Sequence, residues 1–188
     1  MRTVRLLLIA GSLRAGSTNI ALLRTMEALA PAGVTTLLYE GLGRLPHFNP
    51  DDDDGTGPLD PVVSELRSRI AGADAVVIST PEYAGALPGS FKNLLDWTIG
   101  GGETYGKPVA WVNVAGLAAP TGGADAHESL RKVLTYAGAD IVDGACRRIP
   151  VPRGAVGDQG LITDTDIQNQ VTAMLEALLN HLAPAADR

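Results

Sequence analysis

The sequence predicts an α/β fold in which helices cover both faces of a parallel β-sheet. Five apolar runs of strand length alternate along the chain with five segments of helical periodicity. The runs at 4–12 and 107–115 are apolar almost throughout, which is typical of strands buried on both faces of a parallel sheet. Because consecutive parallel strands are joined by right-handed crossovers, the pattern favours a doubly wound sheet.

Length and composition agree with one domain over residues 1–188. The chain is 45% hydrophobic and 19% charged, a globular balance that can form a core without disulfides or metals. A net charge of −6 and 4% aromatic residues argue against a nucleic-acid partner. No apolar run has the length of a membrane span. With Cys146 as the single cysteine, we expect a cytoplasmic protein with no membrane partner and no metal.

The first strand and helix follow one another within residues 4–33. The strand stops at Gly11, and Ser17 or Thr18 can cap the next helix by accepting from its free N–H groups. Spacings of four and three place three apolar side chains on the buried face of that helix: Leu22, Met26 and Leu29.

The same alternation continues to the end of the chain. Strands are expected at 34–40, 74–80, 107–115 and 140–142. Helices are expected to start at Asp60 and Pro61, to cover 91–99, and to end at Gly138. Thr165 and Gln168 are spaced as a capping box at the start of a terminal amphipathic helix.

In a doubly wound sheet the ligand lies beyond the carboxyl ends of the strands. The loops 11–19, 81–90 and 115–123 follow the first, third and fourth strands, and they hold most of the residues that carry chemistry. The first loop joins a buried strand to a helix N-terminus, where free N–H groups favour a phosphate. Its polar side chains are Ser12, Arg14, Ser17, Thr18 and Asn19, all able to donate hydrogen bonds to phosphate oxygens.

Three kinds of phosphate ligand can be compared with this loop. A nucleoside triphosphate loop would need a lysine where Ser17 stands, and a dinucleotide fingerprint would need a glycine two residues after Gly11. A mononucleotide phosphate in a sheet of order 2-1-3-4-5 remains, which points to FMN.

Two segments resemble the NADPH-dependent FMN reductase family, which includes chromate, quinone and azo-dye reductases. GSLRAGSTN at 11–19 resembles the family's GSLRxxSxN phosphate loop, and PEYAGALPGSFKNLLDW at 81–97 resembles its PEYNxxxPGxLKNxxDW segment. The segments at 106–114 and 121–134 resemble the strand and helix that follow, so the similarity covers nearly the whole chain. It implies a flavodoxin-like three-layer fold: a five-stranded parallel sheet of order 2-1-3-4-5 with helices on both faces.

The resemblance also implies a set of FMN-binding residues. Ser12, Arg14, Ser17, Thr18 and Asn19 would hold the phosphate. Pro81, Glu82, Tyr83, Ala84, Gly85 and Gly116 would lie along the isoalloxazine ring. The family usually has Asn at the position of Ala84, so any side-chain hydrogen bond from there to the flavin is lost.

A reductase of this family needs no catalytic acid, base or nucleophile from the protein, because the flavin carries the chemistry. We expect NADPH or NADH to reduce FMN, and a small-molecule acceptor to remove the electrons in a ping-pong cycle. The acceptor is left open among free flavin, a quinone, a metal oxyanion and an azo compound. A flavodoxin-like electron carrier without pyridine-nucleotide activity is the alternative.

Three expectations concern other parts of the chain. The resemblance implies a homodimer or homotetramer with residues 91–97 at an interface, although packing against the sheet would also account for those apolar side chains. The acidic run 51–54 is expected to be a solvated loop beside the rim of the site. His47, His127 and His181 are expected to have surface or packing roles, since no partnered nucleophile accompanies them.

Overall fold

The structure is a computed structural model that describes residues 3–116 and 120–183. Its strands are β1 (Val4–Ala10), β2 (Val34–Tyr39), β3 (Ala75–Ser79), β4 (Pro108–Asn113), β5 (Asp140–Ile141) and β6 (Arg147–Arg148). Its α-helices are α1 (Thr18–Leu29), α2 (Pro61–Gly72), α3 (Gly89–Asp96), α4 (Ala124–Tyr136) and α5 (Thr165–Leu182). Among the described residues, no helix is both long enough and apolar enough to cross a bilayer.

The strands form a parallel sheet in the order β2-β1-β3-β4-β5, so the predicted flavodoxin-like fold is confirmed. The fifth position of the sheet is divided. β5 pairs with the start of β4, and β6 pairs with its end at Val112 and Asn113. A 3₁₀ turn at Asp143–Ala145 interrupts the strand between them, which the sequence pattern did not indicate.

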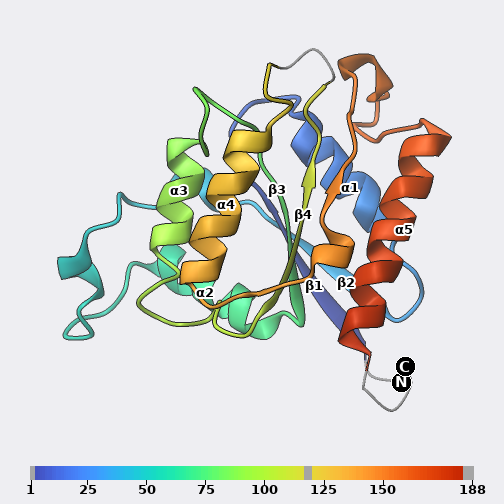
Figure 1. Cartoon of the computed structure of the whole chain (residues 1–188). Coiled ribbons are helices and arrows are strands. Elements are labelled where there is room, and N and C mark those ends of the chain that lie inside the picture. Colours follow the sequence, from blue (N-terminus) through green and yellow to red (C-terminus); the bar gives the residue numbers. More distant parts are fainter. Residues whose placement is uncertain (1–2, 117–119, 184–188) are drawn as a thin grey trace.

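Helices cover both faces of the sheet, with α1 and α5 on one face and α2, α3 and α4 on the other (Figure 1). β1 supplies side chains to both apolar layers. Leu6 and Leu8 pack in the layer under α1 and α5, whereas Leu7 and Ile9 pack in the layer under α2 to α4. Both faces of β1 are therefore buried, which explains why its sequence is apolar throughout.

The helix ends agree in part with the sequence analysis. Asp60 caps α2 as expected, accepting from the N–H of Val62 at 2.7 Å. The predicted capping box at Thr165 is wrong, because Asp164 caps α5 and accepts from Ile167 N at 3.0 Å. Gln168 instead donates its side-chain amide to the Ile162 carbonyl. An aspartate one residue earlier offers a stronger acceptor for the same free N–H groups.

The apolar side chains of segment 91–97 are buried in the core of the chain itself. Phe91 is fully buried and Trp97 is 1% exposed, and Trp97 donates its indole N–H to the Pro46 carbonyl at 2.9 Å. Phe48 stacks edge-on against Trp97, with ring centroids 5.0 Å apart. Packing within the fold, the alternative noted from the sequence, therefore accounts for these side chains, and they offer no surface to a partner.

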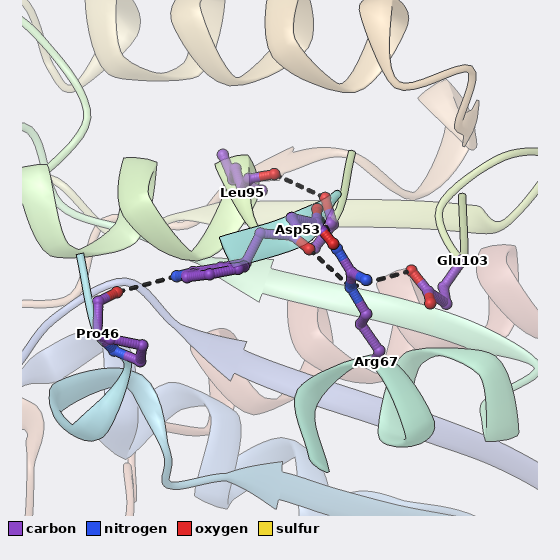
Figure 2. A network of polar contacts seen from close by, with 7 residues as sticks. Pro46, Asp53, Arg67, Leu95 and Glu103 are labelled. Carbon is purple, nitrogen blue, oxygen red and sulfur yellow. Dashed lines mark hydrogen bonds and ion pairs between the residues drawn. The ribbon is translucent and has the colours of Figure 1, made fainter. Parts of the chain in front are cut away.

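The acidic run 51–54 is only partly solvated, which corrects the sequence prediction. Figure 2 shows Asp53 against Arg67, whose Nη2 donates to the carboxylate at 2.6 Å. Both side chains are about nine-tenths buried, and Arg67 Nε donates to the Trp97 carbonyl at 2.9 Å. Glu103 lies 3.9 Å from the same guanidinium. Asp53 thus links the acidic run to α2, at the point where Arg67 also contacts the end of α3.

Removing Arg67 should destabilise the protein strongly. In Arg67→Ala the Asp53 carboxylate is left buried without its cation, which should lower the free energy of unfolding by about 3 kcal/mol. Urea denaturation measures the change. The matched control is Arg69→Ala, two residues further along α2, which removes only an exposed pair with Glu65 and should cost less than about 1 kcal/mol. Equally small losses of unfolding free energy in the two variants would contradict a stabilising role for the buried pair of Asp53 and Arg67.

Candidate active site

A cavity of about 610 Å³ lies at the carboxyl ends of the strands, a volume within the range of small-molecule and cofactor sites. Four segments line it. Those after β1, β3 and β4 were predicted, and the fourth, at 151–153, was not. Polar lining residues include Ser12, Arg14, Ser17, Thr18, Asn19, Thr80, Glu82, Thr121 and Arg153.

Most of the predicted site residues come together in this cavity. The phosphate-loop residues Ser12, Arg14, Ser17, Thr18 and Asn19 all line it, as do Pro81, Glu82, Tyr83 and Gly116. Ala84 and Gly85 are not among the lining residues and lie in the turn that follows Tyr83. Residues 51–54 are not among the residues that line the cavity, so the lining gives no support to the predicted place of this run beside the rim.

The first loop is held against the end of β3 by close backbone packing. Gly11 donates its N–H to the Ser79 carbonyl at 2.8 Å, and a methyl group on Gly11 would overlap the Thr80 hydroxyl. The Ser79 hydroxyl donates to Asn19 Oδ1 at 2.8 Å in a buried contact. That bond occupies the Asn19 oxygen and leaves its two amide donors for a ligand.

Donors at the start of α1 are available to a ligand. Ser17 is the N-cap residue, but its side chain makes no capping hydrogen bond. Ser12 Oγ accepts from the Arg14 N–H at 3.3 Å, which shapes the loop in front of the helix. Within the described residues the Arg14 guanidinium makes no hydrogen bond or ion pair. Free N–H groups, hydroxyls and one cation therefore border the same part of the cavity.

The second loop contains a tight hairpin turn from Tyr83 to Ala86. Tyr83 and Ala86 exchange both backbone hydrogen bonds, at 3.0 and 3.1 Å. Ala84 and Gly85 both have positive φ, +51° and +71°, which is the geometry of a turn that favours Asn-Gly. Among the described residues, Ala84 is the one non-glycine with positive φ. The asparagine expected here by resemblance therefore suits the backbone itself.

Glu82 joins the second loop to the third. Its carboxylate accepts from the Thr121 hydroxyl at 2.5 Å and from the N–H of Ala126 at 3.2 Å. α4 begins after Gly123, which has no side chain to cap it, so Glu82 supplies the missing acceptor. The hydrogen bond from Thr121 is the main reason that the pKa of Glu82 is lowered. The carboxylate is thus engaged within the protein.

The third loop is closed by Asn113 at the end of β4. Its Oδ1 accepts from the Ala115 N–H at 2.9 Å, and its Nδ2 donates to the Gly122 carbonyl at 2.7 Å. Part of this loop, residues 117–119, lies outside the described residues. Asn113 and Thr121 were not singled out from the sequence. A polar residue at the end of an apolar strand was the signal for Asn113, whereas the partner of Thr121 is 39 positions away.

His127 and Cys146 do not line this cavity, and both fit packing roles. His127 Nδ1 donates to the Gly123 carbonyl at 2.7 Å, and burial lowers the pKa of the ring. Burial raises the pKa of the Cys146 thiol, which argues against a reactive thiolate. Among the described residues, no three His, Cys, Asp or Glu side chains are grouped so that they could hold a metal ion.

Comparison with known proteins gives the family. The family model of NADPH-dependent FMN reductases matches residues 4–148. The chain belongs to this family. It is 32% identical over 177 residues to an NAD(P)H-dependent FMN reductase of Pseudomonas aeruginosa, covering 93% of each chain. It is 31% identical over 175 residues to a quinone reductase of Escherichia coli K12, covering 88% of this chain and 90% of the relative.

A solved structure agrees with these relatives. FerB, a flavoenzyme NAD(P)H:(acceptor) oxidoreductase from Paracoccus denitrificans, superimposes with a TM-score of 0.77 at 28% identity, covering 95% of this chain and 98% of FerB. The family member described here is therefore an oxidoreductase with FMN as its cofactor and NAD(P)H as its co-substrate.

Replacing Ala84 by asparagine should stabilise this reductase. An L-residue with positive φ costs about 1–2 kcal/mol, and asparagine tolerates that conformation better than alanine. We expect Ala84→Asn to raise the free energy of unfolding in urea by about 0.5–1 kcal/mol. Ala86→Asn, the same change at an exposed position without positive φ, should alter it by less than about 0.5 kcal/mol. Equal effects at both positions would refute the strain at Ala84.

Proposed function

We propose that the cavity between the loops after β1, β3 and β4 is the FMN site of a single domain spanning residues 1–188. In this proposal the enzyme transfers a hydride from NAD(P)H, through FMN, to a small-molecule acceptor by a ping-pong mechanism. The observation that supports it most is that hydrogen-bond donors at the start of α1 and the exposed Tyr83 line one cavity of about 610 Å³.

The first loop fits a phosphate group. Ser17 at the N-cap position and the free N–H groups of the first turn of α1 present donors beside the cation of Arg14. Ser12, Thr18 and the amide of Asn19 complete the proposed phosphate ligands. These residues of the first loop would bind and orient the cofactor. A phosphate held at the start of α1 would leave the rest of the cofactor to extend toward the loops after β3 and β4.

The second and third loops fit a flat ring. Tyr83 is 51% exposed at the cavity and offers an apolar ring beside Pro81. The turn through Ala84 and Gly85 fixes the position of Tyr83. In the described residues the N–H groups of Glu82 and Gly116 make no hydrogen bond, so they are available to a polar ring edge. Such donors would favour negative charge that develops on the ring.

The residues that line the cavity would hold FMN, and the bound flavin would supply two-electron chemistry between NAD(P)H and the acceptor. The protein would bind and orient the cofactor within this cavity. None of the lining side chains is required as an acid, base or nucleophile. The similarity to a quinone reductase supports a quinone as the acceptor, since a flat quinone could lie in the place that the nicotinamide vacates.

The proposed enzyme is a cytoplasmic homodimer or homotetramer. The single half-buried Cys146 is compatible with a reducing compartment. Ile99, Tyr105 and Tyr136 are exposed by 51%, 81% and 85%, and such apolar side chains suit a subunit interface better than the buried segment 91–97. Sedimentation at micromolar concentration should show an oligomer, and a monomer would refute this part of the proposal.

The function is tested by absorbance spectroscopy. Purified protein titrated with FMN should show a saturable change in the flavin spectrum. One equivalent of NADPH or NADH added without oxygen should then bleach the flavin band, and benzoquinone should restore it. Binding without bleaching by either nucleotide would favour an electron carrier and contradict the reductase. Absence of flavin binding would contradict the assignment of the cavity.

A further inference from the structure

Arg153 lines the proposed FMN cavity although it lies outside the segment matched by the family model, which ends at residue 148. It begins a short 3₁₀ turn, Arg153–Ala155, between β6 and α5. Within the described residues, its guanidinium makes no hydrogen bond and no ion pair. A cation that none of the described residues pairs is therefore present at the cavity.

The backbone on both sides of Arg153 is fixed. Val151 is 4% exposed, and its N–H donates to the Val114 carbonyl just beyond β4. Pro152 restricts its own φ and accepts from the Ala155 N–H at 2.9 Å. Thr163 N–H donates to the Ala155 carbonyl. The fold thus holds the Arg153 backbone at the cavity.

This segment lies on the same face of the sheet as α1. Val151 and Ala155 pack in the apolar layer under α1 and α5, and Figure 1 shows the segment near these helices. The Thr25 hydroxyl of α1 accepts from the Ile162 N–H at 2.9 Å, which ties the end of the segment to the helix. By contrast, the Tyr83 turn precedes α3, which covers the opposite face. Arg153 therefore belongs to the phosphate side of the cavity.

Charge balance favours a second cation on that side. A phosphate monoester carries a charge of about −1.5 to −2 at pH 7, and the first loop contributes only one cation, Arg14. Of the lining residues, Glu82 is the acidic one, and its carboxylate is occupied by Thr121 and Ala126. We propose that Arg153 is a second cationic ligand of the FMN phosphate, acting together with Arg14. This inference rests on the proposed function.

The test compares two flavins that differ by the phosphate. Dissociation constants for FMN and for riboflavin are measured by fluorescence quenching on the wild type, Arg153→Ala, Arg153→Lys and Arg147→Ala. Arg147→Ala is the control because it changes the net charge by the same amount as Arg153→Ala, and because Arg147 is exposed and does not line the cavity. Arg153→Ala should weaken FMN binding about ten- to a hundredfold, the effect of a lost charge-assisted hydrogen bond. Riboflavin binding should not change.

Two control variants test whether the effect depends on a positive charge at the position of Arg153. Arg153→Lys should recover part of the FMN affinity because it keeps the charge, and Arg147→Ala should match the wild type. Unchanged FMN binding in Arg153→Ala would overturn the inference, even if the KM for NADPH rose. Equal weakening of FMN and riboflavin would also overturn it, since the effect would not depend on the phosphate.

A further variant separates this inference from the function on which it rests. Arg14→Ala should weaken FMN binding whether or not Arg153 takes part. If Arg14→Ala weakens binding and Arg153→Ala does not, the role of Arg153 is refuted and the FMN site stands. If neither variant changes FMN affinity, the phosphate does not bind at this loop, and the proposed placement of the cofactor fails as well.

Discussion

The close approach of the ends of β1 and β3 is the constraint on which the rest of the site depends. Gly11 donates to the Ser79 carbonyl and packs so tightly against Thr80 that no side chain fits there. The buried hydrogen bond between Ser79 and Asn19 then ties the start of α1 to β3. These contacts place the first loop and the Tyr83 turn beside the same cavity. This buried hydrogen bond favours one arrangement of α1 and β3, because any arrangement that left either polar group unpaired would cost free energy.

The remaining loops are joined by polar side chains rather than by apolar packing. Glu82 links the Tyr83 segment to the start of α4, and Asn113 closes the loop that leads there. The divided fifth strand has a related consequence. After β6, Ile149 and Val151 continue to donate to carbonyls of Asn113 and Val114, so the chain follows β4 past the sheet edge. That path is what carries Arg153 to the cavity.

The alternation of strands and helices and the loops of the site could be predicted from local sequence pattern, whereas the order of the strands came from the resemblance to the FMN reductase family. A strand such as β1 is apolar throughout since both its faces are buried, and the loops at the carboxyl ends follow from parallel pairing. What the pattern missed depends on contacts between distant positions. Neither the burial of Asp53 against Arg67 nor the bond between Glu82 and Thr121 leaves a mark on local sequence. Arg153 was missed for the same reason.

The most direct test of the account is a crystal structure of the protein with FMN bound. We predict that the phosphate lies among Ser12, Arg14 and Ser17 at the start of α1, and that the ring lies beside Tyr83. A flavin bound elsewhere, or one whose phosphate points away from α1, would contradict the assignment of this cavity as the cofactor site.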